Sequence, residues 1–162
     1  MSVFLPTPES VANLFTSLLG REVEVSLNRR LISEVAIAAS YSDDSAKRVA
    51  VCLLDMNLGA SLGAALSLVP KAVADNAGDA VELPEGILEN LHEVLNISAQ
   101  FFYNEDTERI SLENIYPPPD EFPLDIIPLI DQKENRVDMR VDIQGYRSGN
   151  IAFLALDGIH SE

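Results

Sequence analysis

The sequence predicts an α+β domain in which a largely antiparallel sheet packs against a long helix and shorter helices. Two observations favour this fold class. The predicted order is helix, three strands, helix, long helix and then about three strands, so helices and strands do not simply alternate. Several strand connections have the length of hairpins, which favours antiparallel pairing. At 162 residues, the chain has the length of a single domain, residues 1–162, with its own core.

The chain is expected to begin with a helix over residues 8–19. Thr7 supplies a capping hydroxyl, Pro8 suits the first helical position, and Gly20 supplies the stop. Apolar residues recur between them at helical spacing, which predicts one buried face. Three strand patterns follow, over residues 22–27, 35–40 and 48–55.

A second, short helix is expected between Asn57, which we take as its cap, and Pro70. Gly59 and Gly63 leave one side of this helix almost bare, which indicates close packing against another backbone. The polar residues 71–80 that follow predict a linker rather than an element of secondary structure.

The second half of the chain predicts one long helix and then strands. The helix covers residues 84–103, and a strand over residues 109–116 ends at three consecutive prolines. Residues 122–135 are apolar but irregular, which is typical of either an edge strand or a buried loop. A closing hairpin is expected from residues 136–144, a turn over 145–149 and residues 150–157.

The charge of the chain limits its partners. It has 11 basic and 26 acidic residues and a net charge of −15, so its field repels nucleic acids and anionic membrane surfaces. The sequence shows no signal peptide and no membrane span, and its single cysteine, Cys52, lies in an apolar run that predicts a buried strand. We therefore expect a cytoplasmic protein with no nucleic-acid or membrane partner.

The long helix carries the candidate site. At about 100° per residue, Glu89, Glu93, Asn96 and Gln100 fall within a wedge of roughly 60°, opposite the apolar stripe. We term these four residues the acid–amide face. Glu93 and Asn96 are surface neighbours because they are three residues apart, and no cation stands at helical spacing to neutralise Glu93. The pattern fits either a functional surface or the ordinary solvated side of a helix.

The sequence has too few suitable residues for other catalytic mechanisms. His92 lies about 100° around the helix from Glu93, so it is expected to flank the face rather than to act as a base. His160 is close to the end of the chain. With these two histidines and Cys52, the sequence offers neither a zinc site nor a Cys/His pair, and it has no phosphate-binding glycine motif.

The long helix resembles the signature of the CheC/CheX/FliY family of chemotaxis phosphatases. The family signature contains a Glu, two residues, an Asn, twenty-two residues and a Pro. Glu93-Val-Leu-Asn96, followed by twenty-two residues and Pro119, has the same spacing. Glu89 occupies the first position, where the family has Asp or Ser. The first helix has no second Glu-x-x-Asn, so the chain is similar to the single-site CheX type, and the resemblance implies a CheC/CheX-like fold.

The resemblance implies hydrolysis of the aspartyl-phosphate on a CheY-like receiver domain. Asn96 would hold the attacking water, and Glu93 would pair with the receiver's active-site lysine. Glu89 and Gln100 would contact the partner. The reaction needs no cofactor of this chain, because the receiver carries its own Mg²⁺.

Two readings remain open from the sequence. One is the phosphatase, and the other is a non-catalytic interaction module of the same fold that binds a signalling or flagellar-switch partner. The resemblance also implies a possible homodimer through sheet edges, for which the apolar residues 126–130 are a candidate contact if they are not buried.

Overall fold

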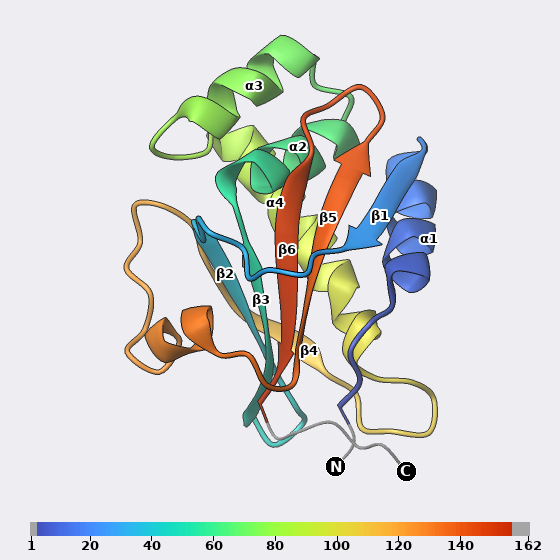
Figure 1. Ribbon diagram of the computed structural model, residues 1–162, viewed down its shortest axis with the longest axis vertical. Helices are drawn as coiled ribbons and strands as arrows, with labels where there is room; N and C mark the ends of the chain where they lie inside the picture. The colour runs from blue at the N-terminus through green and yellow to red at the C-terminus, as the bar shows by residue number, and fades with distance from the viewer. Residues whose placement is uncertain (1–2, 157–162) are drawn as a thin grey trace.

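The computed structural model describes residues 3–156, which form an α+β structure with one antiparallel sheet (Figure 1). Within these residues the sheet has six strands in the order β1-β5-β6-β3-β2-β4. Their bounds are β1 Val23–Leu27, β2 Ile37–Ser42, β3 Arg48–Leu54, β4 Ser111–Tyr116, β5 Arg136–Ile143 and β6 Gly149–Ala155. The predicted fold class is therefore confirmed, and β1 and β4 are the two edge strands.

Four α-helices accompany the sheet in the described residues. They are α1 Pro8–Leu19, α2 Met56–Leu66, α3 Lys71–Asp79 and α4 Glu85–Ile97. Two 3-10 helices, η1 Ser98–Phe102 and η2 Ile127–Asp131, complete the elements. Residues 3–156 contain no helix that is both long and apolar enough to cross a membrane.

The first helix has the predicted bounds because its signals are local. The Thr7 hydroxyl accepts a hydrogen bond from the Ser10 backbone, and the Ser10 hydroxyl accepts one from the Thr7 backbone, so two unpaired donors are satisfied. Gly20 ends the helix in the left-handed conformation, with φ of 68°.

The predicted cap of α2 is wrong. The helix is capped by Asp55, whose carboxylate accepts from the Leu58 backbone at 2.9 Å, and not by Asn57. A second oxygen of Asp55 accepts from the backbone and the side chain of Asn150 in β6. Asp55 therefore joins the end of β3 to α2 and to the neighbouring strand. The helix ends at Leu66, before the expected Pro70.

The predicted linker over residues 71–80 is also wrong, because most of it forms α3. Ala74 and Ala77 are buried against the rest of the protein, although the helix is polar overall. Arg147, in the turn between β5 and β6, forms ion pairs with Asp75 and Asp79 at 3.3 and 2.8 Å. Tertiary contacts thus stabilise a helix that has a weak sequence pattern.

The long predicted helix ends as an α-helix at Ile97 and continues as η1 to Phe102. The Ser98 hydroxyl donates to the Val94 carbonyl at 2.7 Å, a bond that competes with the regular helical ladder. The tighter turn that follows places both Phe101 and Phe102 in the core.

The later strands agree with the prediction to within two residues, except that Asp157 lies outside the described residues. Residues 122–135 form a loop with η2 rather than an edge strand. Ile126 in this loop is buried in a small cluster with Leu53 and Leu154, on the sheet face away from the helices. Ile127 beside it is half exposed.

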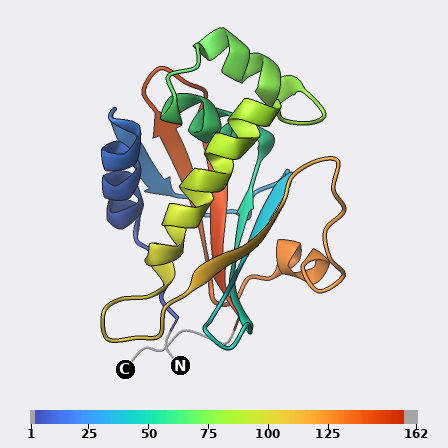
Figure 2. The ribbon, with the colours of Figure 1, turned by 180° about the vertical axis from the view of Figure 1, so that it is seen from behind.

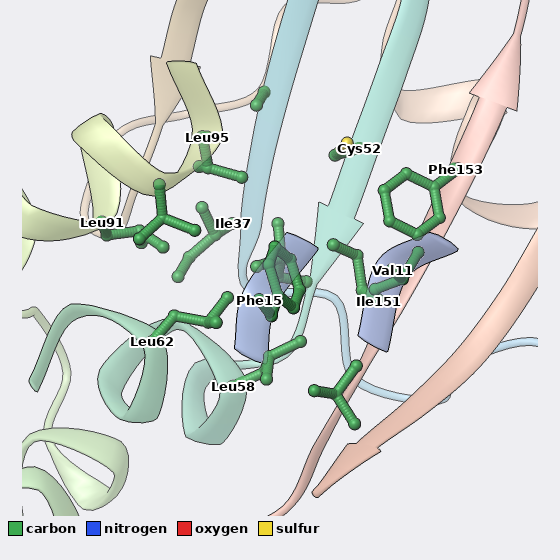
Figure 3. Packing of buried hydrophobic residues seen from close by; sticks show 14 of the residues in the cluster. Val11, Phe15, Ile37, Cys52, Leu58, Leu62, Leu91, Leu95, Ile151 and Phe153 are labelled. Atoms are coloured by element: carbon green, nitrogen blue, oxygen red, sulfur yellow. The ribbon is translucent and has the colours of Figure 1, made fainter. Parts of the chain in front are cut away.

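The main core lies between the sheet and the helices α1, α2 and α4 (Figure 3). Leu58 and Leu62 from α2 meet Leu91 and Leu95 from α4 in this layer. Phe15 of α1 packs edge-on against Phe101, at 5.9 Å between ring centroids. The helix that carries the candidate site is therefore fixed along its whole inner side.

The contact between α2 and α4 depends on Gly63. A Cβ at this position would overlap the carbonyl oxygen and the side chain of Ile87 in α4. A Cβ at Gly59 would overlap the Ile37 side chain and also approach Leu91. The predicted close approach of another backbone is confirmed at Gly63, and its partner is the helix of the candidate site.

Replacing Gly63 by alanine is expected to lower the free energy of unfolding by roughly 1–3 kcal/mol, because backbone atoms of α4 must move to accept the methyl group. Gly86→Ala is the matched control, since a Cβ there meets nothing within 4 Å and alanine favours the helix. Urea denaturation of both variants measures the effect. Equal stability of the two variants would contradict the close contact.

Candidate functional site

The candidate site is the outer side of α4. Figure 2 shows this helix in front of the sheet, with no other helix or strand drawn over its outer side. Its inner residues Ile87, Leu91, Val94 and Leu95 are buried. The side opposite them is exposed and is where the sequence places the acid–amide face.

All four residues of the acid–amide face are exposed: Glu89, Glu93, Asn96 and Gln100. Their side chains form no hydrogen bond or ion pair with any other residue of the range 3–156. Glu93 and Asn96 lie on regular α-helix three residues apart, so their Cβ atoms are about 5–6 Å from each other. An acid and an amide are thus adjacent and available to a partner.

The position of Gln100 differs from the prediction because it lies on η1 and not on α-helix. A 3-10 turn advances about 120° per residue instead of 100°. Gln100 nevertheless stays close to Asn96, since both line one small pocket of about 230 Å³. The other lining residues come from the helix end and from the chain entering β4: Ile97, Ala99, Tyr103, Arg109, Ile110 and Ser111.

Glu89 borders a second, larger hollow of about 480 Å³ between α4 and the end of β4. The hollow also includes His92, so this histidine lies beside Glu89. Its remaining lining residues are Leu88, Ile115, Pro117 and Asp120. Glu93 therefore stands between two depressions, one turn from Glu89 and one turn from Asn96.

Three hydrogen bonds, from Asn90 and Tyr41, hold α4 at the height of the site. The Asn90 amide donates to the Gly63 carbonyl at 2.8 Å and to the Ser67 hydroxyl at 2.7 Å, which ties α4 to α2. The Tyr41 hydroxyl donates to the Leu95 carbonyl at 2.7 Å, directly beside Asn96. The backbone that carries Glu93 and Asn96 is thus held by hydrogen bonds as well as by packing.

Arg109 is a residue of the site that the sequence analysis did not connect with it. It lines the pocket of Asn96 and Gln100 and is the one basic residue in that lining. The signal was present in the sequence, because a strand that returns antiparallel to the preceding helix brings its first residues beside the helix end. Arg109 places a positive charge beside Asn96 and Gln100 of the acid–amide face.

The proline of the signature lies apart from the acid and the amide. Pro119 lines a different depression together with Val35 and Ala36, beyond the end of β4. This separation follows from chain direction: β4 starts beside Asn96 and carries the chain back along α4, so Pro117 already lies level with Glu89.

Cys52 offers no alternative chemistry. It is fully buried in β3, as predicted, and burial raises the pKa of its thiol to about 12. Its neighbour Tyr41 is also fully buried, and its pKa is raised well above the usual value by the same cause. Residues 3–156 contain no group of three or more His, Cys, Asp or Glu side chains that could hold a metal ion, and His160 lies outside them.

Comparisons with known proteins show the fold but no close relative. No protein-family model matches the sequence, and no curated protein matches it. Among solved structures, the chain is similar to one from the FliM–SpeE complex of H. pylori, with a TM-score of 0.61 and 9% identity. This match covers 93% of the chain and 83% of the solved one.

Two further FliM structures give the same picture. The FliM middle domain from Vibrio alginolyticus has a TM-score of 0.56 and 11% identity, over 92% of this chain and 87% of that one. A chain of the FliG–FliM complex from H. pylori has a TM-score of 0.51 and 10% identity, over 93% and 88%. The similarity to a CheX from Desulfovibrio desulfuricans is lower, with a TM-score of 0.42 and 7% identity, over 91% and 95%.

These similarities define the class of the fold. The chain has an α+β fold like that of the FliM middle domain and of the chains from the two FliM complexes above. The identities are too low to transfer an activity, so the fold class is the extent of this result.

The buried Cys52 and Tyr41 predict a loss of stability at alkaline pH. Both pKa values are raised in the folded protein, so the unfolded chain releases these protons first, starting near pH 9 for the thiol. The stabilisation is complete below pH 9 and decreases as the pH rises towards 12, by about 1.4 kcal/mol per pH unit for each ionised group. Urea denaturation between pH 8 and pH 11 measures this slope, and Cys52→Ala is expected to make it shallower. An identical slope in the variant would contradict the raised thiol pKa.

Proposed function

We propose that the acid–amide face docks a phosphorylated receiver domain and that Glu93 and Asn96 promote hydrolysis of its aspartyl-phosphate. The observation that carries this proposal is the exposure of both side chains, unpaired and adjacent, on a helix held by its inner side. A reaction of this kind depends on positioning, which a fixed helix provides.

In the proposed reaction a water molecule attacks the phosphorus atom, and the bond between phosphorus and the aspartyl oxygen breaks. The products are inorganic phosphate and a free carboxylate. An amide suits the task of holding the water because it offers a donor and an acceptor and does not titrate. We assign this role to Asn96. The metal ion that balances the phosphoryl charge belongs to the receiver.

Glu93 has a separate role in the proposal, which is to pair with a lysine of the receiver and fix the docking geometry. A single charged contact in a closing interface sets the register between two helices. Glu89 and Gln100 flank this contact from the two depressions beside it, and they are proposed to contact the partner.

A second candidate function is a non-catalytic binding module that uses the same face. It is favoured by the comparisons, because the chain is similar to a FliM middle domain and to chains from two complexes, FliM–SpeE and FliG–FliM. Glu89 at the position where the signature has Asp or Ser also favours this reading. Both candidates require the acid–amide face to bind a protein, and they differ in whether phosphate is released.

The catalytic role is tested by phosphate release from phosphorylated receivers of the same organism. The wild-type protein is expected to accelerate release, and Asn96→Ala to reduce the acceleration by roughly 100-fold, because it removes the group that positions the water. Asn13→Ala on α1 is the matched control, since Asn13 is an exposed helical amide on a different helix. Receiver binding without any acceleration would leave the binding module as the function.

The docking role of Glu93 is tested by affinity. Glu93→Lys is expected to weaken receiver binding by roughly tenfold, about 1.4 kcal/mol, because it reverses the charge at the centre of the face. Glu24→Lys makes the same change at an exposed position of β1, the opposite sheet edge, and is expected to leave the affinity within about twofold. Titration calorimetry measures both variants, and equal weakening by the two would show that overall charge, and not this face, governs binding.

A further inference from the structure

Several basic residues of this acidic protein lie together at one pocket. Four of its 11 basic residues line a single pocket of about 820 Å³. They are Arg29, Arg30, Lys133 and Arg136. We term this the basic pocket. It is separate from the acid–amide face, because its wall includes Asp138 of β5, on the sheet face away from α4.

Figure 1 shows how the pocket is built, with the chain after β1 crossing in front of β5 and β6, on the side opposite α4. This segment is fixed on both sides of Arg29 and Arg30. The Asn28 backbone donates to the Asp138 carbonyl at 2.8 Å, and the Ile32 backbone donates to the Asp138 carboxylate at 3.1 Å. The two arginines are therefore presented by an anchored segment.

The floor of the pocket is a neutral pair. Arg136 and Asp138 have side chains only 1% and 5% exposed, and they are joined by two hydrogen bonds at 2.8 and 3.0 Å. Nη1 of Arg136 donates to three backbone carbonyls, those of Leu129, Ile130 and Gln132. The one acidic residue of the lining is thus already neutralised.

The other three cations are available. Arg29, Arg30 and Lys133 are exposed, and their side chains form no hydrogen bond or ion pair within residues 3–156. The lining therefore carries three uncompensated positive charges. Apolar surface adjoins them, since Leu27 is 60% exposed and also lines the pocket.

We propose that the basic pocket binds a short acidic segment of a protein partner. Carboxylate side chains would pair with Arg29, Arg30 and Lys133, and an apolar side chain of the segment would cover Leu27. Guanidinium groups suit carboxylates because their planar donors match both oxygens.

The surroundings favour a short segment over a nucleic acid. Glu22, Glu24 and Asp142 line a separate depression along the paired strands β1 and β5. A polyanion that continues past the pocket along these strands reaches the carboxylates, which repel it. A short segment ends inside the pocket and avoids them.

The test uses a fluorescein-labelled hexaglutamate peptide and fluorescence anisotropy at low salt. The wild-type protein is expected to bind it, and Arg30→Glu to weaken binding at least tenfold. Lys71→Glu is the matched control, because it changes the net charge equally at an exposed basic residue of α3 and is expected to change affinity less than twofold. Lys133→Glu is expected to act like Arg30→Glu. Thermal unfolding confirms that each variant is folded.

Three outcomes would overturn the proposal. The first is absence of binding, and the second is equal weakening by Arg30→Glu and Lys71→Glu, which would assign binding to overall charge. The third is tighter, Arg30-dependent binding of a single-stranded 12-nucleotide DNA or of vesicles of phosphatidylserine and phosphatidylcholine. That result would assign the pocket to phosphate groups instead of carboxylates. Hexaglutamine, which has the same length without charge, is expected not to bind.

Discussion

The close approach of α2 and α4 at Gly63 is the contact on which the candidate site depends. Any larger residue there would separate the two helices, because the Ile87 backbone occupies the space. The same approach lets Asn90 reach the Gly63 carbonyl and lets Leu91 and Leu95 fill the core. A side chain on a helix is positioned only as well as the helix itself, so the glycine of one helix sets the geometry of the polar face of another.

Local signals made parts of the fold predictable. The bounds of α1 follow from Thr7, Pro8 and Gly20, which act on neighbouring residues. The strands were located by alternating polar and apolar residues or by apolar runs. By contrast, α3 was missed because its support comes from Arg147, 72 residues further along the chain from Asp75. Residues 71–80 have alanine, glycine and polar residues with a single larger apolar side chain, Val73, so the local pattern gives no sign of such a partner.

The candidate site was also predictable only in part. Helical spacing alone placed Glu93 and Asn96 on one exposed side, since both lie on regular α-helix. Helical spacing did not predict the change from α-helix to η1 before Gln100. It also did not predict that Arg109 lines the same pocket as Asn96. The basic pocket could not be predicted, because Arg29 and Arg30 lie about a hundred residues before Lys133 and Arg136, and only the sheet order brings the two segments together.

The position of β4 at the edge of the sheet has a consequence for how such a protein would assemble. Its residues Ser111 and Ile115 each border one of the two depressions beside α4, and its outer side has no neighbouring strand in the order of the sheet. A chain that extended the sheet at β4 would lie alongside both depressions. Binding of a second chain at this edge and binding of a partner to α4 would then be thermodynamically coupled, so that each would change the affinity of the other.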